Sequence, residues 1–334
     1  MRAAILDKYD KNGRELQIRE LPAPEPGPGE VLVRVHTAGV NPLDNMIIRG
    51  EVKLIVPYHL PLTMGNELVG TVEALGPGAS RFAVGDRVYG RMPLARIGAF
   101  AEYAAVAETA LAKVPDHLSD EEAACVPLTA LTALQALQLM GAKAGDSLFI
   151  SGGTGSLGAM AVPVAASMGL TVATNGNGAS EERMRALGAS TFIDYRKQDY
   201  AEVLHDVDFV LDTLGDRELP KEFGVLRQGG TLVSLRGLPN GEFARRAGLP
   251  LWKRLAFGLV GGKYDRMAAK RGQRYRFVFV HEDGEGLARI PELMGNRRLE
   301  ASVDGVFALD DVNTALAKVA AGGSKGKTVL AVSG

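Results

Sequence analysis

Three glycines with the spacing Gly153-x-Gly155-x-x-Gly158 stand between a short apolar run and an alanine-rich stretch. In a strand–turn–helix unit the first glycine permits a tight turn, the second lets the backbone approach a pyrophosphate, and the third lets the helix pack on the strand. The pattern alone is weak in a chain with 41 glycines, but the flanking strand and helix patterns make it a predicted dinucleotide site, with the phosphates at a helix N-terminus. The predicted cofactor-binding residues of this loop are Gly153, Thr154, Gly155, Ser156, Leu157 and Gly158.

Strand and helix patterns alternate from residue 147 onward, and these elements position the glycine loop. Their alternation predicts parallel βαβ units, and therefore an α/β fold with a doubly wound parallel sheet of the Rossmann type. Ligands bind at the carboxyl ends of such strands, so Leu235 and Arg236 are further candidate cofactor-binding residues. The predicted strands are 147–150, 171–174, 192–194, 209–212 and 231–235, with a helix over about 180–187.

Residues 1–122 have a different, β-rich pattern. Runs of strand character at 31–36, 70–75 and 86–90 are separated by glycine-containing turns, which predicts a small barrel-like domain.

Ser119 and Glu122 form a capping-box pattern, and we expect the alanine- and leucine-rich helix that follows to link two domains. The segment 328–332 has the pattern of a strand that returns to the first domain. The predicted domains are a substrate domain over 1–122, completed by about 285–334, and a dinucleotide-binding domain over 123–284.

The bulk properties exclude several classes of function. A net charge of −1 gives no basis for binding nucleic acid, and no apolar run is long enough to predict an integral membrane segment. The single cysteine, Cys125, excludes an intrachain disulfide and a zinc site built on several thiolates. The first residues lack the apolar run of a signal peptide, so we expect a cytoplasmic protein.

Several blocks in a fixed order resemble the medium-chain dehydrogenase/reductase superfamily, specifically its zinc-free quinone-reductase branch. The resemblance implies an N-terminal GroES-like domain, a Rossmann domain, an active site in the cleft between them, and a homodimer. Besides the glycine loop, the resembling blocks are 38–44, 65–72, 84–89, 98–103, 127–133 and 186–189.

The end of the second predicted strand of the Rossmann domain indicates which cofactor binds. NAD-specific sites place an Asp or Glu about 20 residues past the glycines, whereas residues 174–178 contain no carboxylate. Asn175, Ser180 and Arg183 offer polar groups for a 2′-phosphate, which favours NADPH. The alternative is that Arg183 is an ordinary solvated helix charge.

The resemblance adds four cofactor-binding candidates. It implies that Thr129 packs beside the nicotinamide, Tyr195 lies near the adenosine phosphate, the strand around Phe279 contacts the carboxamide, and Lys327 lies near the cleft. Thr129 has the alternative of bonding a backbone carbonyl one turn back, and Lys327 that of being solvated.

No metal is predicted. Zinc-dependent relatives place a cysteine where this chain has Asn41 and a histidine where it has Asn66, and Cys125 matches the third ligand position. Amides are poor zinc ligands, and the five histidines show no ligand spacing. Cys125 is then a small buried residue.

Without a Lewis acid, alcohol oxidation is difficult, whereas hydride delivery to an electron-poor acceptor needs only hydrogen-bond donors at the developing oxyanion. We therefore predict reduction of quinones, or of the C=C bond of enals and enones. The alternatives are a zinc alcohol dehydrogenase and a non-catalytic NADPH-binding redox sensor. The candidate substrate-pocket residues are Asn41, Asp44, Tyr58 and Asn66, although Tyr58 has the alternative of ordinary loop packing and Asn41 that of a turn former.

Residues 236–276 are unusually basic, with eleven Lys and Arg against two acidic residues, a net charge of +9. The middle of this segment contains Trp252, which is the only tryptophan of the chain. A basic amphipathic helix here suits an anionic membrane or a partner. The alternative is a cleft-lining insertion or dimer contact with a buried apolar face.

Overall fold

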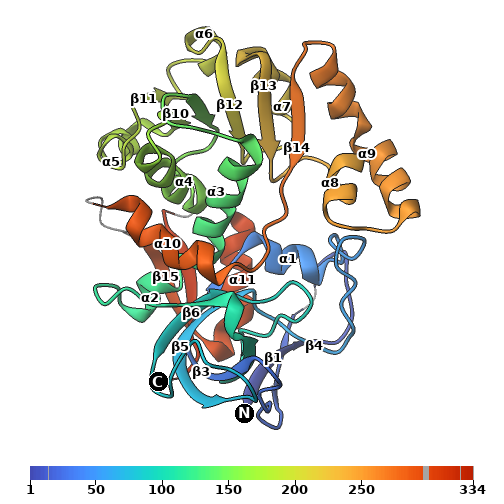
Figure 1. Ribbon diagram of the computed structural model, residues 1–334, viewed down its shortest axis with the longest axis vertical. Coiled ribbons are helices and arrows are strands. Elements are labelled where there is room, and N and C mark those ends of the chain that lie inside the picture. The colour runs from blue at the N-terminus through green and yellow to red at the C-terminus, as the bar shows by residue number, and fades with distance from the viewer. Residues whose placement is uncertain (14, 296–300, 324, 334) are drawn as a thin grey trace. The chain divides into compact units, whose positions relative to one another are not determined.

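The computed structural model describes residues 1–13, 15–295, 301–323 and 325–333. The chain forms two compact units (Figure 1). Unit 1 comprises Met1–Leu131, His281–Glu292 and Leu299–Gly334, and unit 2 comprises Thr132–Val280 and Leu293–Arg298. Two helices, α3 (Pro127–Met140) and α10 (Gly284–Met294), contain residues of both units.

Unit 2 is built on a six-stranded parallel sheet with the strand order β11-β10-β9-β12-β13-β14. In chain order this is the 3-2-1-4-5-6 arrangement of a Rossmann fold, so the predicted fold class is confirmed. Its strands are β9 (Ser147–Ile150), β10 (Thr171–Gly176), β11 (Thr191–Asp194), β12 (Val207–Asp212), β13 (Leu226–Ser234) and β14 (Arg274–Phe277). Its helices are α4 (Ser156–Ser167), η2 (Gly178–Ser180), α5 (Glu181–Ala186), α6 (Tyr200–Val203), α7 (Leu219–Val225), α8 (Gly241–Arg246) and α9 (Leu251–Ala269).

Unit 1 is a mostly antiparallel β-domain with a long central strand, β3, and one parallel pair, β15 with β16. The C-terminal strand β16 pairs antiparallel with β3, with Leu330 opposite Ala38, so the returning strand predicted from the sequence is confirmed. The strands of unit 1 are β1 (Arg2–Leu6), β2 (Gln17–Glu20), β3 (Glu30–Val40), β4 (Leu62–Thr63), β5 (Glu67–Leu75), β6 (Arg87–Arg91), β7 (Tyr103–Ala107), β8 (Leu111–Lys113), β15 (Val303–Ala308) and β16 (Lys327–Ala331). Its helices are α1 (Pro42–Ile48), η1 (Glu108–Ala110), α2 (Asp120–Ala123), η3 (Leu309–Asp311) and α11 (Val312–Ala321).

The expected linking helix is two helices. The predicted capping box is present, because Ser119 Oγ accepts from the Glu122 N–H and the Glu122 side chain accepts from the Ser119 N–H, but α2 ends at Ala123. Pro127 has no N–H to continue the helix and instead occupies the first position of α3.

Residues Asp120–Met140 are long and apolar enough to cross a membrane. Since 78% of the most apolar window is buried inside the protein, it has the environment of a core helix.

Candidate functional site

The glycine loop of unit 2 leaves no room for side chains where the turn meets its neighbours. A Cβ on Gly153 would lie 1.8 Å from Thr174 Oγ1, and one on Gly158 would lie 2.4 Å from Gly153 Cα. Gly155 differs, because an added Cβ would meet only Gly152 O at 3.5 Å. The first and third glycines therefore serve the fold, whereas the second keeps the start of α4 open to an approaching ligand.

The start of α4 has the form of an anion site. Gly155 is its N-cap residue and contributes no side-chain hydrogen bond to the first turn. A helix of this length presents N–H groups and the positive end of its dipole at this point, and a dinucleotide pyrophosphate suits both. Thr154, Ser156 and Leu157 surround that point in the sequence.

Asn175 supports the loop from β10. Its Oδ1 accepts a hydrogen bond from the Gly152 N–H at 2.8 Å, and its carbonyl accepts one from the Gly153 N–H at 3.1 Å. The side chain is 6% exposed. The sequence suggested Asn175 as a phosphate contact. In the structure its Oδ1 atom instead accepts a hydrogen bond that holds the glycine turn.

The residues predicted to face a 2′-phosphate lie beyond the end of β10. Ser180 ends η2, and Arg183 lies in α5. Tyr195 is 57% exposed, and the Arg196 guanidinium lies 5.9 Å from the centre of its ring. These groups present a cation and an exposed phenol on the same side of the sheet as the glycine loop, at the ends of neighbouring strands.

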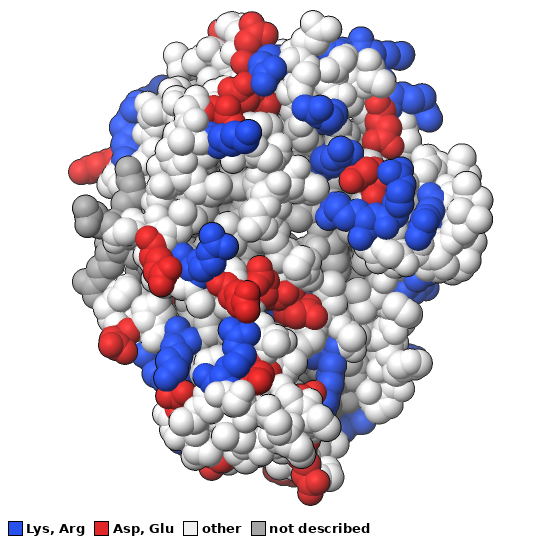
Figure 2. Space-filling view, in the orientation of Figure 1, with Lys and Arg blue, Asp and Glu red and all other residues white. Residues whose placement is uncertain are grey.

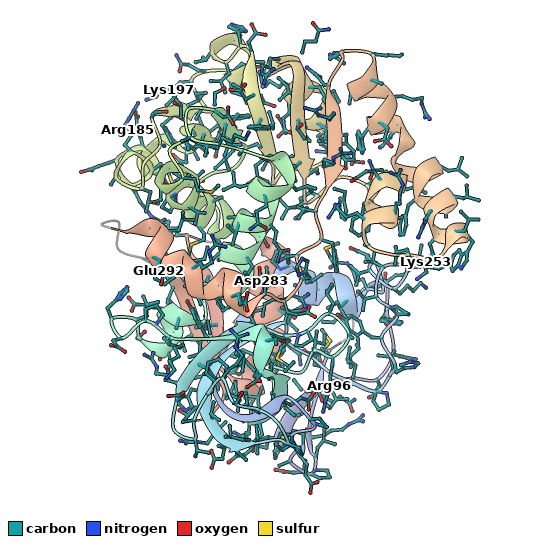
Figure 3. The ribbon with its side chains drawn as sticks, in the orientation of Figure 1. Arg96, Arg185, Lys197, Lys253, Asp283 and Glu292 are labelled. Carbon is teal, nitrogen blue, oxygen red and sulfur yellow. The ribbon has the colours of Figure 1, made fainter. Side chains whose placement is uncertain are left out.

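A carboxylate that sequence reasoning overlooked lies among them. Asp194 ends β11 opposite Gly176, and a Cβ on Gly178 would lie 2.4 Å from its Oδ2. Its charge is partly offset by Lys197, whose Nζ lies 3.6 Å from Oδ2 (Figure 3 labels Lys197). The search for an acid about 20 residues past the glycines missed Asp194 because this acid comes from the next strand.

The other carboxyl ends of the sheet hold the remaining predicted cofactor contacts. Leu235 follows β13, where its N–H donates to the carbonyl of Asp212, and Arg236 is next to it in the chain. Phe279 was expected in a strand, but β14 ends at Phe277, and residues 278–280 continue without regular pairing. The sheet ends there because the Val278 N–H makes the last bond to β13, at Ser234 O.

In unit 1, Lys327 joins residues from distant parts of the chain. Its Nζ lies 2.6 Å from Glu67 Oε1 and donates to Asn41 Oδ1 at 2.5 Å. The Asn41 amide in turn donates to Glu67 Oε1 at 2.8 Å and to Gly39 O at 3.2 Å. The side chains of Lys327 and Glu67 are 4% and 0% exposed, so Lys327 is not solvated.

Asp44 and Asn66 form a second buried pair beside this group. Asn66 Nδ2 donates to Asp44 Oδ1 at 2.7 Å, and the Asn41 N–H donates to Asp44 Oδ2 at 2.8 Å. Burial raises the pKa of Asp44 to about 7, although both hydrogen bonds act in the opposite direction. Asn66 Oδ1 is buried without a hydrogen-bond partner among the described residues. The structure thus brings together three of the four predicted pocket residues.

Arg91 is a buried cation that the sequence did not mark as functional. Its side chain is 0% exposed, Nη1 donates to Met92 O, and Glu282 Oε2 lies 3.9 Å from Nη1. Nε and Nη2 have no hydrogen-bond partner among the described residues. The only signal for it is an arginine within the apolar run that follows Tyr89.

Tyr58 is the fourth predicted pocket residue, and it lies within electrostatic range of Arg91. Burial raises the pKa of the Tyr58 phenol to about 12, and the Arg91 charge lowers it in part. The phenol makes no hydrogen bond with another described residue, whereas the Tyr58 carbonyl accepts one from Tyr9. The protonated Tyr58 phenol and the fully buried Nε–Nη2 edge of Arg91 are therefore two donors of unit 1 that have no acceptor among the described residues.

Thr129 and Cys125 lie at the start of α3 and just before it. Thr129 Oγ1 donates to Cys125 O at 2.7 Å, which is the back-bonding alternative considered above. Cys125 is buried, its Sγ donates to Glu121 O at 3.2 Å, and burial raises its pKa to about 12. Cys125 is therefore a protonated, structural thiol.

Comparison with known proteins identifies the family. Residues 27–116 match the model of the alcohol dehydrogenase GroES-like domain, and residues 187–330 match that of the zinc-binding dehydrogenases. The chain is 30% identical over 356 aligned positions to the mitochondrial NAD(P)H oxidoreductase RTN4IP1 of Mus musculus, covering 99% of this chain and 89% of that protein. The chain belongs to the medium-chain dehydrogenase/reductase superfamily and is an oxidoreductase.

Two further members of the superfamily show its breadth. The 2-methylene-furan-3-one reductase of Solanum lycopersicum is 28% identical, covering 90% of this chain and 71% of that protein. The solved quinone oxidoreductase of Thermus thermophilus, also determined in complex with NADPH, has a TM-score of 0.75 at 28% identity, covering 99% of this chain and 100% of that one. The resemblance to the quinone-reductase branch is thereby confirmed.

The described residues do not fit the zinc of some superfamily members. No group of three or more His, Cys, Asp or Glu that could hold a metal occurs in the part of the chain that the structure describes. At the position of the first zinc ligand, Asn41 Oδ1 already accepts from the Lys327 ammonium, so a second cation there would face a fixed positive charge. The dinucleotide loop, by contrast, fits a nicotinamide dinucleotide.

Proposed function

We propose that this chain is an NADPH-dependent reductase that transfers hydride to quinones, or to the C=C bond of α,β-unsaturated carbonyls, without a metal. The observation that carries the proposal is the pair of donors without an acceptor among the described residues, Tyr58 and Arg91, near a zinc-ligand position where the Lys327 ammonium binds. Such a site supplies hydrogen bonds to a carbonyl oxygen but no Lewis acid to an alcohol.

When bound, the nicotinamide supplies the hydride. The residues of unit 2 orient it through the glycine loop and the N-terminus of α4. In unit 1, the Nε–Nη2 edge of Arg91 offers two N–H donors to the acceptor oxygen, whose negative charge grows as hydride arrives. Tyr58 adds a third donor, because a phenol with a pKa of about 12 keeps its proton at neutral pH.

Asn41, Asp44 and Asn66 position this site in our proposal and do not contact the acceptor. Both N–H groups of the Asn41 amide are engaged, by Glu67 and by Gly39. Asp44 accepts from the Asn41 backbone and from the Asn66 side chain, which ties the start of α1 to the strand that carries Glu67. Arg91 lies opposite Glu67 in the β5–β6 pair, so the network fixes the strand on which Arg91 stands.

We also propose NADPH as the preferred donor. Arg183, Arg196 and Tyr195 offer groups for a 2′-phosphate, and the NADPH complex of the Thermus relative supports the same choice. Asp194 opposes it, since a carboxylate repels a phosphate. The expected result is a kcat/KM for NADPH above that for NADH, with Asp194→Asn raising the ratio several-fold. A higher kcat/KM for NADH would contradict the assignment.

The direct test of the activity is anaerobic NADPH oxidation with quinones, enals and enones as acceptors. A second assay measures NADP+ reduction with primary and secondary alcohols as hydride donors. We expect turnover with at least one quinone, enal or enone, and none with the alcohols. Tyr58→Phe should lower kcat, with Tyr103→Phe in strand β7 of unit 1 as the matched control, because Tyr9 donates to the Tyr58 carbonyl and would disturb Tyr58 itself. Turnover confined to alcohols would overturn the proposal.

A further inference from the structure

Helix α9, within the basic segment 236–276, has one face that packs against unit 2. Phe257, Gly261, Tyr264 and Ala268 are buried and recur every three or four residues along it. Gly261 marks the closest approach, since a Cβ there would lie 2.5 Å from Pro239 O. The packing of this face fixes the rotation of the helix and therefore determines which residues point outward.

The outward face of α9 begins as an apolar stripe. Leu251, Leu255 and Leu259 are 69%, 64% and 83% exposed, and Trp252 beside them is 60% exposed. Residues four apart lie above one another on a helix, so the three leucines form one line along two turns. The sequence left open whether the apolar face of this helix is buried. In the described part of the chain these leucines and Trp252 are exposed.

The same line continues as a basic stripe. Lys263 follows Leu259 by four residues, and Arg266 and Lys270 follow in turn, all three exposed. Figure 2 shows Lys and Arg side chains gathered over α8 and α9 at the right of the view, and Figure 3 labels Lys253 there. Of Lys263, Arg266 and Lys270, only Lys263 has an ion pair within the described residues, to Asp216 at 3.3 Å, while Lys253 lies over the Trp252 ring at 5.6 Å.

The charge of the segment decides between the possible occupants of this stripe. Three exposed leucines in one line, with the exposed Trp252 beside them, mark an interaction surface. A second copy that placed the same face against this one would bring together two segments that each carry +9. An anionic lipid surface matches both halves of the line, because leucine and tryptophan enter the interface while lysine and arginine meet the headgroups.

We propose that the outward face of α9 docks this protein on the surface of an anionic lipid bilayer, with Trp252, Leu251, Leu255 and Leu259 in the interface and Arg266 and Lys270 at the headgroups. The proposal stands independently of the proposed reductase activity, because none of its residues belongs to either part of the candidate site.

The experiment uses the single tryptophan as the probe. The full chain is titrated with phosphatidylcholine vesicles and with vesicles of phosphatidylcholine and phosphatidylglycerol at a 7:3 ratio, while Trp252 emission is followed and co-flotation is measured. We expect a blue shift and flotation with the anionic vesicles, with an apparent affinity at least about tenfold above that for phosphatidylcholine alone. Raising the salt concentration should weaken the binding.

Two pairs of variants locate the surface. Leu255→Glu/Leu259→Glu should lower the vesicle affinity by about tenfold or more, whereas Val84→Glu, at a residue 63% exposed in unit 1, should not. Arg266→Glu/Lys270→Glu should lower it as well, and Lys143→Glu should leave it unchanged. Circular dichroism and unaltered NADPH oxidation show that each variant is folded.

Three results would overturn the proposal. One is the absence of a Trp252 shift with either vesicle, and another is equal affinity for neutral and anionic vesicles. The third is concentration-dependent dimerisation in sedimentation velocity that Leu255→Glu/Leu259→Glu abolishes, since a second copy would then cover the stripe. A vesicle-binding protein without reductase turnover would sustain this inference and refute the proposed function.

Discussion

The two groups of candidate residues, one in each unit, are built in opposite ways. In unit 2 the glycine loop works through its backbone, and Gly153 and Gly158 matter because they lack a Cβ. In unit 1 the site works through side chains, and Lys327 reaches Asn41 across 286 residues of sequence. At Gly153 and Gly158 the loop has no space for an added Cβ, whereas the buried group in unit 1 depends on every partner being present. The comparison teaches that a site formed by glycine backbone lies within one short stretch of sequence, whereas a site formed by side-chain contacts draws on residues far apart in the sequence.

The largest expected effect comes from breaking the contacts of unit 1. Lys327→Met leaves the buried Glu67 carboxylate without its cation, and removing one partner of a buried ion pair costs about 3–5 kcal/mol. Urea denaturation should show this loss in the free energy of unfolding. The double variant Lys327→Met/Glu67→Gln should recover much of it, and a double variant as unstable as the single one would show that the pair is not the cause.

The same region should give the chain a distinctive pH dependence. Burial raises the folded-state pKa of Asp44 from 3.8 to about 7, so between these values the folded state holds a proton that the unfolded state has released. The Asp44 contribution is therefore full below pH 4 and is lost as the pH rises toward 7, at up to about 1.4 kcal/mol per pH unit. Unfolding free energies measured from pH 4 to 8 should show this slope in the wild type and not in Asp44→Asn. An equal slope in both proteins would assign it to other groups.

Arg91 separates function from stability within unit 1. Arg91→Met removes a buried guanidinium with two unsatisfied nitrogens, and the ion-pair partner that it leaves, Glu282, is 34% exposed to solvent, so the stability of the variant should change little. Its kcat for a quinone or enone should fall about 100-fold, as for other lost oxyanion donors. The Arg91→Lys variant keeps the charge without the planar guanidinium edge, so its kcat should lie between those of the wild type and Arg91→Met. Loss of stability with unchanged kcat would make Arg91 a structural residue.

In unit 2 the matched variants Gly155→Ala and Gly158→Ala test whether the missing Cβ at each glycine serves ligand binding or the packing of the fold. An alanine at 155 meets only Gly152 O at 3.5 Å, so the melting temperature should hold while the Kd for NADPH rises about tenfold, or 1.4 kcal/mol. An alanine at 158 would lie 2.4 Å from Gly153 Cα, so that variant should lose stability first. Calorimetric titration and thermal melts separate the two effects. Equal NADPH affinity in wild type and Gly155→Ala would show that the phosphates bind elsewhere.

The same contrast explains what the sequence could predict. The Rossmann fold, its glycine turn and the returning strand at the C-terminus follow from periodicity and spacing, which are local properties. The break after Ala123 was missed because helical composition outweighed the effect of Pro127. The end of β14 at Phe277 depends on where β13 stops offering partners, which no local pattern shows.

Within the site, the residues whose role depends on distant partners were the hardest to predict. Glu67 stood in a recognised block and Arg91 directly after the predicted strand 86–90, but nothing local indicates that Glu67 holds Lys327 or that Arg91 keeps an unsatisfied edge. Asn175 was chosen because it follows the predicted strand 171–174, and only the fold shows that it lies within β10 with its side chain turned to Gly152. Asp194 approaches the same region from a neighbouring strand, which a search along one segment cannot find.

The most direct test of the central claim is the single-turnover rate of NADPH oxidation by a quinone or enal, measured anaerobically before and after exhaustive dialysis against a zinc chelator. The Lys327 ammonium, bound by Asn41 and Glu67, stands where a metal would need its ligands. We therefore predict the same rate constant in both samples, and no increase when zinc is added. A rate that falls on chelation and returns with zinc would contradict the account.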